Sequence, residues 1–137
     1  MTDNTSKRIE DSRTTLSLLM GQQNANRLGN VHGGVIMKLV DEAGAIAAMK
    51  HAQSPVVTVA VDSMTFVYPI HIGDVVTFTA ELTYVGRTSM EARVEVVTEN
   101  PMTADRRISN TAYLVYVALD ANGKPTPVDP LLLETEE

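Results

Sequence analysis

The pattern of apolar and polar residues changes period at Ser54-Pro55, and the change separates a helical segment from a series of strands. Before it, apolar residues recur at helical spacing through the segment Val35 to His51. They cover most of the circumference of the predicted helix, so we expect it to be largely buried. The apolar positions are Val35, Ile36, Leu39, Val40, Ala43, Ile46, Ala47 and Met49.

After Pro55 the apolar residues become β-branched and follow the two-residue period of strands. Val56 to Val67 is apolar on both faces, which predicts a central strand. Two alternating segments follow, joined by the turn Gly86-Arg87-Thr88, and they predict a long antiparallel hairpin. The inward positions are Val76, Phe78, Ala80, Leu82 and Tyr84 in the first segment, and Met90, Ala92, Val94 and Val96 in the second.

Two further strands complete the predicted sheet, Thr14 to Met20 and Ile108 to Asp120. The order is strand, long helix and then four strands, which indicates an α+β fold with an antiparallel sheet wrapped around one central helix. We expect a flexible N-terminus over residues 1–12, one domain over residues 13–130 and an acidic tail over residues 131–137.

Composition narrows the possible functions. The chain of 137 residues has a net charge of −6, which argues against broad binding to nucleic acid or to an anionic membrane. It has no cysteine, so disulfides, thiolate metal sites and a cysteine nucleophile are excluded. No signal sequence and no apolar run long enough to span a membrane is present, and we expect a cytoplasmic protein.

The candidate chemistry lies around the segment NRLGNVHGG, Asn26 to Gly34, and in the helix that follows it. Asp41 stands in an apolar run, where an unpartnered carboxylate is costly. It is either the partner of Lys38 in an ordinary ion pair, or a carboxylate kept for catalysis. Asn26 taken alone indicates a turn or cap residue, since asparagine often bonds its own backbone in loops.

The ordered pattern N-x-x-G-x-x-HGG-x-x-M-x-x-x-D, from Asn26 to Asp41, resembles that of the hotdog-fold acyl-CoA thioesterases of the acyl-CoA hydrolase type. The resemblance extends from about Thr14 to Pro130 and includes VDSMTFVYPIHIGD, GRTSMEARVEV and VALDANGKPTPV. It implies hydrolysis of acyl-CoA to a fatty acid and coenzyme A, with no cofactor. It also implies a dimer with the active site across its interface, and assembly of dimers into a tetramer or hexamer.

The resemblance assigns roles residue by residue. Asp41 is expected to be the general base or the nucleophile, and Asn26 to position the water or the thioester. The amides of Gly33 and Gly34, at the start of the helix, are expected to stabilise the oxyanion. His32, Arg87, Thr88 and Ser89 are expected to contact the substrate, with Arg87 on a phosphate.

Several residues remain open or secondary at this level. Arg106, Arg107 and Lys124 are looser candidates for a phosphate contact, and Asp62 is either an edge-strand residue or a dimer-interface residue. His32, His51 and His71 have no metal-ligand spacing, so no metal is expected.

Three other functions remain possible. A non-catalytic acyl-CoA-binding or sensing module would keep the ligand groove without needing Asp41. A hydratase would want a catalytic histidine within the helix, and a purely structural dimer would leave Asp41 and the glycines unexplained.

Overall fold

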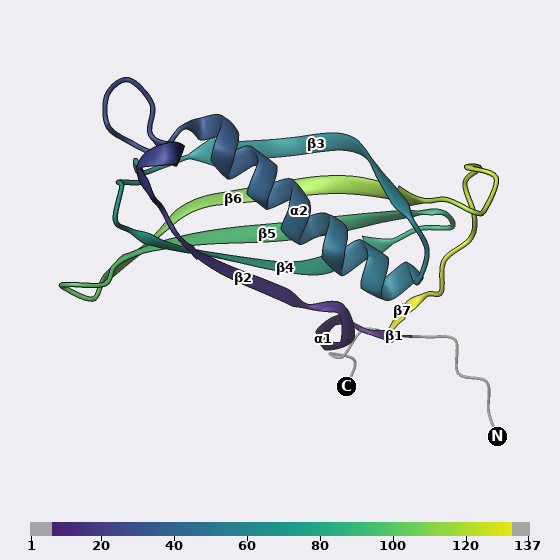
Figure 1. The fold of residues 1–137 in the computed structure, drawn as a ribbon. Coiled ribbons are helices and arrows are strands. Elements are labelled where there is room, and N and C mark those ends of the chain that lie inside the picture. The colour runs from purple at the N-terminus through teal and green to yellow at the C-terminus, as the bar shows by residue number, and fades with distance from the viewer. Residues whose placement is uncertain (1–6, 133–137) are drawn as a thin grey trace.

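A five-stranded antiparallel sheet carries the fold, and one long helix lies across one of its faces (Figure 1). The computed structural model describes residues 7–132. This confirms the α+β architecture with one central helix. In spatial order the strands are β2 (Thr14–Leu19), β4 (Val75–Val85), β5 (Ser89–Asn100), β6 (Asp105–Ala118) and β3 (Val56–Phe66).

The long helix α2 spans Gly33–Ala52. It ends at Gln53, which adopts a left-handed conformation with φ 56° and donates its backbone N–H to the Met49 carbonyl. One face, from Ile36 to His51, is buried on the sheet, but Met37 and Met49 remain 48% and 41% exposed. The prediction of a largely buried helix is therefore wrong in extent, because a single sheet covers only one side of it.

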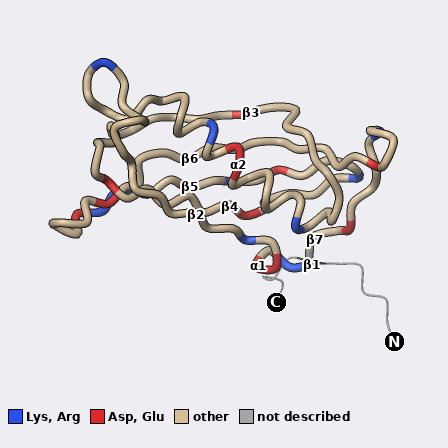
Figure 2. The backbone as a smooth tube through the Cα atoms, viewed as in Figure 1, with Lys and Arg blue, Asp and Glu red and all other residues tan. Residues whose placement is uncertain are grey.

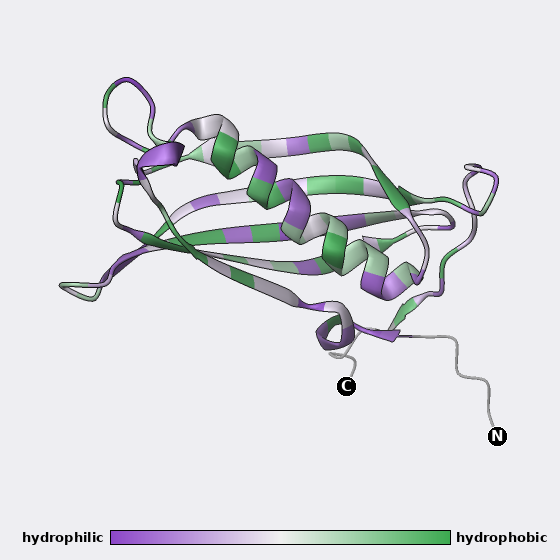
Figure 3. Ribbon diagram, viewed as in Figure 1, coloured by the Kyte–Doolittle hydropathy of each residue, from purple (hydrophilic) through white to green (hydrophobic). Residues whose placement is uncertain are grey.

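The core forms where the inward residues of the sheet meet the buried face of α2. The alternation predicted in β4 and β5 is confirmed, with Val76, Phe78, Ala80 and Leu82 and then Met90, Ala92, Val94 and Val96 fully buried. In Figure 3, apolar and polar colours alternate along β5 accordingly. Tyr84 is an exception at 62% exposed, because the register of β4 against β5 shifts between Leu82 and Tyr84.

The strand β3 was expected at the centre of the sheet and lies instead at its edge. Its valines Val57, Val59 and Val61 are 43%, 53% and 43% exposed. Its pairing with β6 shifts register twice, between Thr58 and Ala60 and between Val61 and Ser63. An apolar pattern on both faces of a strand predicts that both faces are buried. It does not distinguish a central strand from an edge strand that meets another chain.

The two ends of the described chain are held together near the end of α2. The described part of the expected flexible N-terminus forms β1 (Lys7–Arg8) and the short helix α1 (Ile9–Ser12) instead. The strand β1 pairs in parallel with β7 (Leu131–Leu132). The rest of the expected acidic tail lies outside the described residues.

Charged residues of both signs are dispersed along the chain rather than separated by sign (Figure 2). Within residues 7–132, no helix combines the length and the apolar character that crossing a membrane would require. A short 3-10 helix, η1 (Gln22–Asn24), leads from β2 into the glycine-containing loop before α2.

Candidate active site

Asp41 is held at the surface of α2 by two hydroxyl groups. Its Oδ1 accepts hydrogen bonds from Thr58 Oγ1 at 2.8 Å and from the Tyr116 hydroxyl at 3.0 Å. Its Oδ2 has no hydrogen bond or ion pair to any residue between 7 and 132. Lys38 forms no ion pair with it there, so the alternative of an ordinary helical ion pair is not what the structure shows. The carboxylate is fixed through one oxygen and open at the other.

The open side of Asp41 belongs to a groove between α2 and the β3 edge. Its walls are mostly apolar, so a charge inside it is less well solvated than at an open surface. Asp41, Thr58 and Lys38 supply the polar groups of the wall. The remaining lining residues are Gly34, Met37, Val40, Val61, Met64 and Leu114.

Thr58 and Tyr116 were not identified from the sequence. They face each other as paired residues of the antiparallel strands β3 and β6, which brings both hydroxyls to the same carboxylate. The only local signals are a threonine inside the apolar run VVTVAV and a tyrosine inside AYLVYVAL. Neither signal could be connected with Asp41 without knowing which strands pair.

Asn26 stabilises its own loop and also keeps a donor available. Its Oδ1 accepts hydrogen bonds from the backbone N–H groups of Leu28 at 2.9 Å and Asn30 at 3.1 Å. Gly29, with φ 85°, lets the loop close tightly. No residue in the described part of the chain accepts a hydrogen bond from the Asn26 amide nitrogen. The turn function is therefore confirmed, and it leaves the NH₂ group without an acceptor among residues 7–132.

His32 caps the start of α2, and this changes the expectation for the two glycines. Its Nδ1 accepts a 3.4 Å hydrogen bond from the Gly34 N–H, so a neutral ring carries its proton on Nε2. The Gly33 N–H makes no hydrogen bond within residues 7–132. Gly33 thus presents an unoccupied donor at the positive end of the helix dipole, while the Gly34 donor is covered by His32.

Asn26 and Asp41 line different hollows within one chain. Asn26 and Gly33 share a pocket with Ile36 and Phe66, whereas Asp41 lines the groove described above. The structure of a single chain therefore does not bring these two predicted residues together.

The turn Gly86-Arg87-Thr88 lies at the opposite end of β4 from the Asn26 loop (Figure 1). It closes through a 2.8 Å hydrogen bond from Gly86 N to Ser89 O. The carbonyls of Arg87 and Thr88 accept hydrogen bonds from Val128 N and Ala118 N, which anchors the turn to the C-terminal segment. The Arg87 side chain is exposed and joins none of the ion pairs formed by the described residues.

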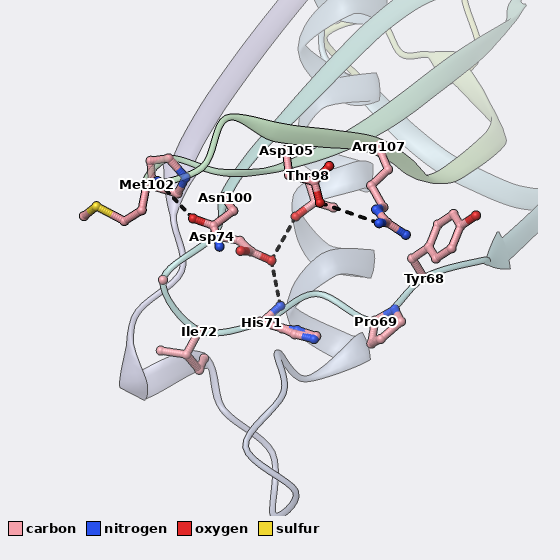
Figure 4. A pocket seen from close by; sticks show the side chains of 12 residues that line it. Tyr68, Pro69, His71, Ile72, Asp74, Thr98, Asn100, Met102, Asp105 and Arg107 are labelled. Carbon is pink, nitrogen blue, oxygen red and sulfur yellow. Dashed lines mark hydrogen bonds and ion pairs between the residues drawn. The ribbon is translucent and has the colours of Figure 1, made fainter.

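A separate polar pocket lies by the β5–β6 turn (Figure 4). There the Arg107 guanidinium lies 4.9 Å from the centre of the Tyr68 ring and pairs with Asp105 at 3.5 Å. Asp74 accepts hydrogen bonds from His71 N and Thr98 Oγ1. Because Arg107 is already paired with Asp105, it is less available for a phosphate than Arg87.

The remaining candidate residues from the sequence lie on the surface of the protein. Arg106 and Lys124 are exposed, and Asp62 is an exposed residue of the β3 edge. In the described part of the chain, no three residues of the metal-binding types gather closely enough to hold an ion.

A long helix on an antiparallel sheet, with an acidic side chain lining an apolar groove, defines a hotdog-type domain. The chain belongs to the Thioesterase superfamily, whose family model matches residues 28–104.

Among its relatives, the chain is 40% identical over 112 residues to the acyl-CoA thioester hydrolase YkhA of Bacillus subtilis, itself uncharacterised. That match covers 82% of this chain and 65% of YkhA, so the chain spans just under two thirds of that relative.

Solved structures agree in fold. The acyl-CoA hydrolase of Staphylococcus aureus, in complex with butyryl coenzyme A and coenzyme A, has a TM-score of 0.89 and 34% identity, covering 96% of this chain and 80% of that one. An apo-hexameric acyl-CoA thioesterase has a TM-score of 0.93 and 39% identity, covering 96% and 85%.

Variants of the S. aureus enzyme have also been solved with alanine in place of an asparagine, an aspartate and a threonine. The three replaced residues are spaced along that chain as Asn26, Asp41 and Thr58 are spaced here.

Proposed function

We propose that this protein is an acyl-CoA thioester hydrolase that uses Asp41 as its general base or nucleophile. The single observation that carries the proposal is the state of the Asp41 carboxylate, fixed through Oδ1 by two hydroxyls and open at Oδ2 toward an apolar groove. Membership of the Thioesterase superfamily and the acyl-CoA relatives support the substrate class.

In the general-base form, Asp41 Oδ2 takes a proton from a water molecule whose oxygen attacks the thioester carbonyl carbon. The tetrahedral intermediate collapses with cleavage of the carbon–sulfur bond, and the proton passes to the departing sulfur. The products are a carboxylic acid and the free thiol of coenzyme A. The residues supply every proton transfer in this sequence, so the proposal includes no metal or other cofactor.

The oxyanion of the intermediate requires donors, and the loop before α2 offers them. The Asn26 NH₂ and the Gly33 N–H have no hydrogen-bond acceptor within residues 7–132, and a helix start favours negative charge. His32 Nε2–H is a third donor in the same loop. We assign the Gly34 N–H a secondary role, because it already donates to His32.

We propose that a second copy of the chain completes the site. Asn26 and Asp41 line separate pockets in one chain, and the uncovered apolar edge β3 offers a surface for pairing. An isologous dimer joined at β3 would place the loop of one protomer beside the carboxylate of its partner, giving two equivalent sites. The hexameric relative supports further assembly of such dimers into a tetramer or hexamer.

Coenzyme A carries several negative charges and the protein has a net charge of −6, so binding needs a local cation. We propose that Arg87 supplies it, because its guanidinium is exposed and joins no ion pair of the described chain, with Thr88 and Ser89 beside it. Nucleic acid and membranes are not partners in this proposal, and the location is cytoplasmic.

The proposal is tested by measuring thiol release from acetyl-, butyryl-, hexanoyl- and palmitoyl-CoA. Asp41→Asn should lower kcat by about 100-fold or more while acyl-CoA still binds, because the amide cannot accept the proton. Glu42→Gln removes a neighbouring exposed carboxylate of the same helix and should leave turnover unchanged. Tight binding without turnover by the wild-type protein would instead establish a non-catalytic acyl-CoA-binding module.

A further inference from the structure

The Tyr116 hydroxyl reaches Asp41 from the buried side of α2. Tyr116 lies on β6 with its side chain 0% exposed. Its hydroxyl is 3.0 Å from the Asp41 backbone carbonyl and 3.0 Å from Asp41 Oδ1, so one proton lies between two acceptors. Thr58 holds the same Oδ1 from the β3 side. The carboxylate is therefore restrained from two directions at Oδ1, and it lines the groove with Oδ2 unbonded within residues 7–132.

This contact depends on a glycine one turn further along the helix. A Cβ added to Gly44 would clash with the Tyr116 hydroxyl oxygen and stand 3.1 Å from Cζ. No side chain at this position leaves room for the hydroxyl where it now lies. Gly44 is buried in the middle of α2, and its φ is not positive, so the backbone does not require a glycine there. The space that the Tyr116 hydroxyl occupies does require one.

We propose that Tyr116 is a positioning residue for the hydrolysis, admitted by Gly44, whose hydroxyl fixes the Asp41 carboxylate with Oδ2 turned into the groove. The inference rests on the proposed hydrolase function and goes beyond it, because it assigns a role to a buried side chain that contacts no substrate. A restrained carboxylate keeps its reacting oxygen aligned with water and avoids a search among rotamers at each turnover.

The phenol is suited to this role because it stays protonated. Burial, and then the adjacent Asp41 charge, raise the pKa of Tyr116 far above its usual range. The hydroxyl is therefore a hydrogen-bond donor at every pH at which the enzyme would work. The other charged group lining the groove is Lys38 of α2, while β3 and β6 contribute only neutral side chains to it.

The test compares Tyr116→Phe with Tyr113→Phe. Tyr113 lies on the outward face of the same strand, and its hydroxyl makes no hydrogen bond within residues 7–132. Tyr116→Phe should lower kcat by about 10- to 100-fold with little change in KM, which is the range expected for loss of a hydrogen bond to a charged group. Tyr113→Phe should behave as the wild type.

The pH profile separates positioning from a purely structural effect. A donor to the carboxylate favours its charged form, so removal of the hydroxyl should move the acid limb of the kcat–pH profile to higher pH, whereas a purely structural loss would lower kcat equally at every pH. The carboxyl-carbon NMR chemical shift of Asp41 should also change at neutral pH when the hydroxyl is removed, whether or not the protein turns over substrate. An Asp41 chemical shift equal to that of the Tyr113→Phe control would show that the hydroxyl bonds only the helix backbone, and it would overturn the proposal.

Gly44→Ala supplies a second route that does not depend on catalysis. The added Cβ should displace the hydroxyl and lower the midpoint of urea unfolding. The decrease in the midpoint should be smaller when Gly44→Ala is made in Tyr116→Phe, which lacks the clashing oxygen. An equal decrease in the urea midpoint in the wild type and in Tyr116→Phe would contradict the role given to Gly44. If no protein, wild type included, hydrolyses any acyl-CoA, the proposed function fails, while the Asp41 carboxyl-carbon chemical shift still decides whether the Tyr116 hydroxyl contacts the carboxylate.

Discussion

At the scale of single residues, Asp41 and Asn26 are built in the same way. Each side chain is fixed through one oxygen and keeps its other polar atom open. Asp41 Oδ1 is held by two side-chain hydroxyls, and Asn26 Oδ1 by two backbone N–H groups. Fixing one atom orients the other without occupying it, which is how a site can be rigid before substrate arrives.

Replacing Asn26 by aspartate tests this arrangement. The aspartate keeps an oxygen for the N–H groups of Leu28 and Asn30 and loses the NH₂ donor. We expect kcat to fall by about 100-fold, since a lost oxyanion donor typically costs that much, with the folded loop retained. Asn24→Asp is the matched control, because Asn24 Oδ1 also accepts a backbone N–H, from Gly21.

Thiol release and the far-ultraviolet circular dichroism spectrum give the two readouts. Equal activity of Asn26→Asp and the wild type would show that the asparagine serves only the turn.

Asp41 and Asn26 could be named from the sequence because they belong to an ordered local pattern between residues 26 and 41. Thr58 and Tyr116 could not, because their contact with Asp41 spans 17 and 75 positions along the chain. Such contacts depend on strand register, which local periodicity does not specify.

At the scale of elements, the edge strand β3 leaves apolar side chains and one backbone edge uncovered in a single chain. Three of its valines are between 43% and 53% exposed, and one side of its backbone lacks a neighbouring strand among the described residues. An uncovered apolar edge normally meets another chain.

Val59→Lys should prevent two chains from pairing at β3, because a charged side chain at this edge must lose its hydration on association. We expect sedimentation velocity to show a monomer, with thiol release lost because Asn26 and Asp41 no longer meet. Met102→Lys introduces the same charge on the β5–β6 turn, where Met102 is 89% exposed, and should leave both properties intact. A fully active monomer of Val59→Lys would refute the two-chain site.

At the scale of the whole molecule, the two ends of the described chain meet at the end of α2. Lys7 Nζ contacts the His51 carbonyl at 2.7 Å and Asp129 at 3.2 Å, and the buried His51 ring is 2.7 Å from the Asp129 carbonyl. This closure joins the N-terminal segment, the helix end and the C-terminal segment. It explains why Lys7–Ser12 is structured where composition predicted a flexible segment.

The stability of the whole fold should depend on Tyr116 at high pH. Its folded-state pKa lies above the unfolded value of about 10, so above that pH the unfolded chain loses a proton that the folded chain keeps. The stabilisation is therefore complete below pH 10 and declines as pH rises further, by up to about 1.4 kcal/mol per pH unit.

Between pH 9 and about 11, urea unfolding should show the free energy of unfolding of the wild type falling as pH rises. The fall should be smaller in Tyr116→Phe and as large as in the wild type in Tyr113→Phe. Parallel curves for all three proteins would argue against a buried, protonated phenol.

The sequence alone determined the main elements of this protein and singled out Asp41 as the candidate carboxylate, because periodicity and ordered motifs are local properties. It predicted α2, the β4–β5 hairpin and the inward residues of both strands, with Tyr84 displaced by a shift in register. Tertiary structure decided that β3 lies at the edge, that Thr58 and Tyr116 meet at Asp41, and that Gly44 admits the tyrosine. Those features arise from contacts between segments distant along the chain, and only the folded arrangement specifies which segments come together.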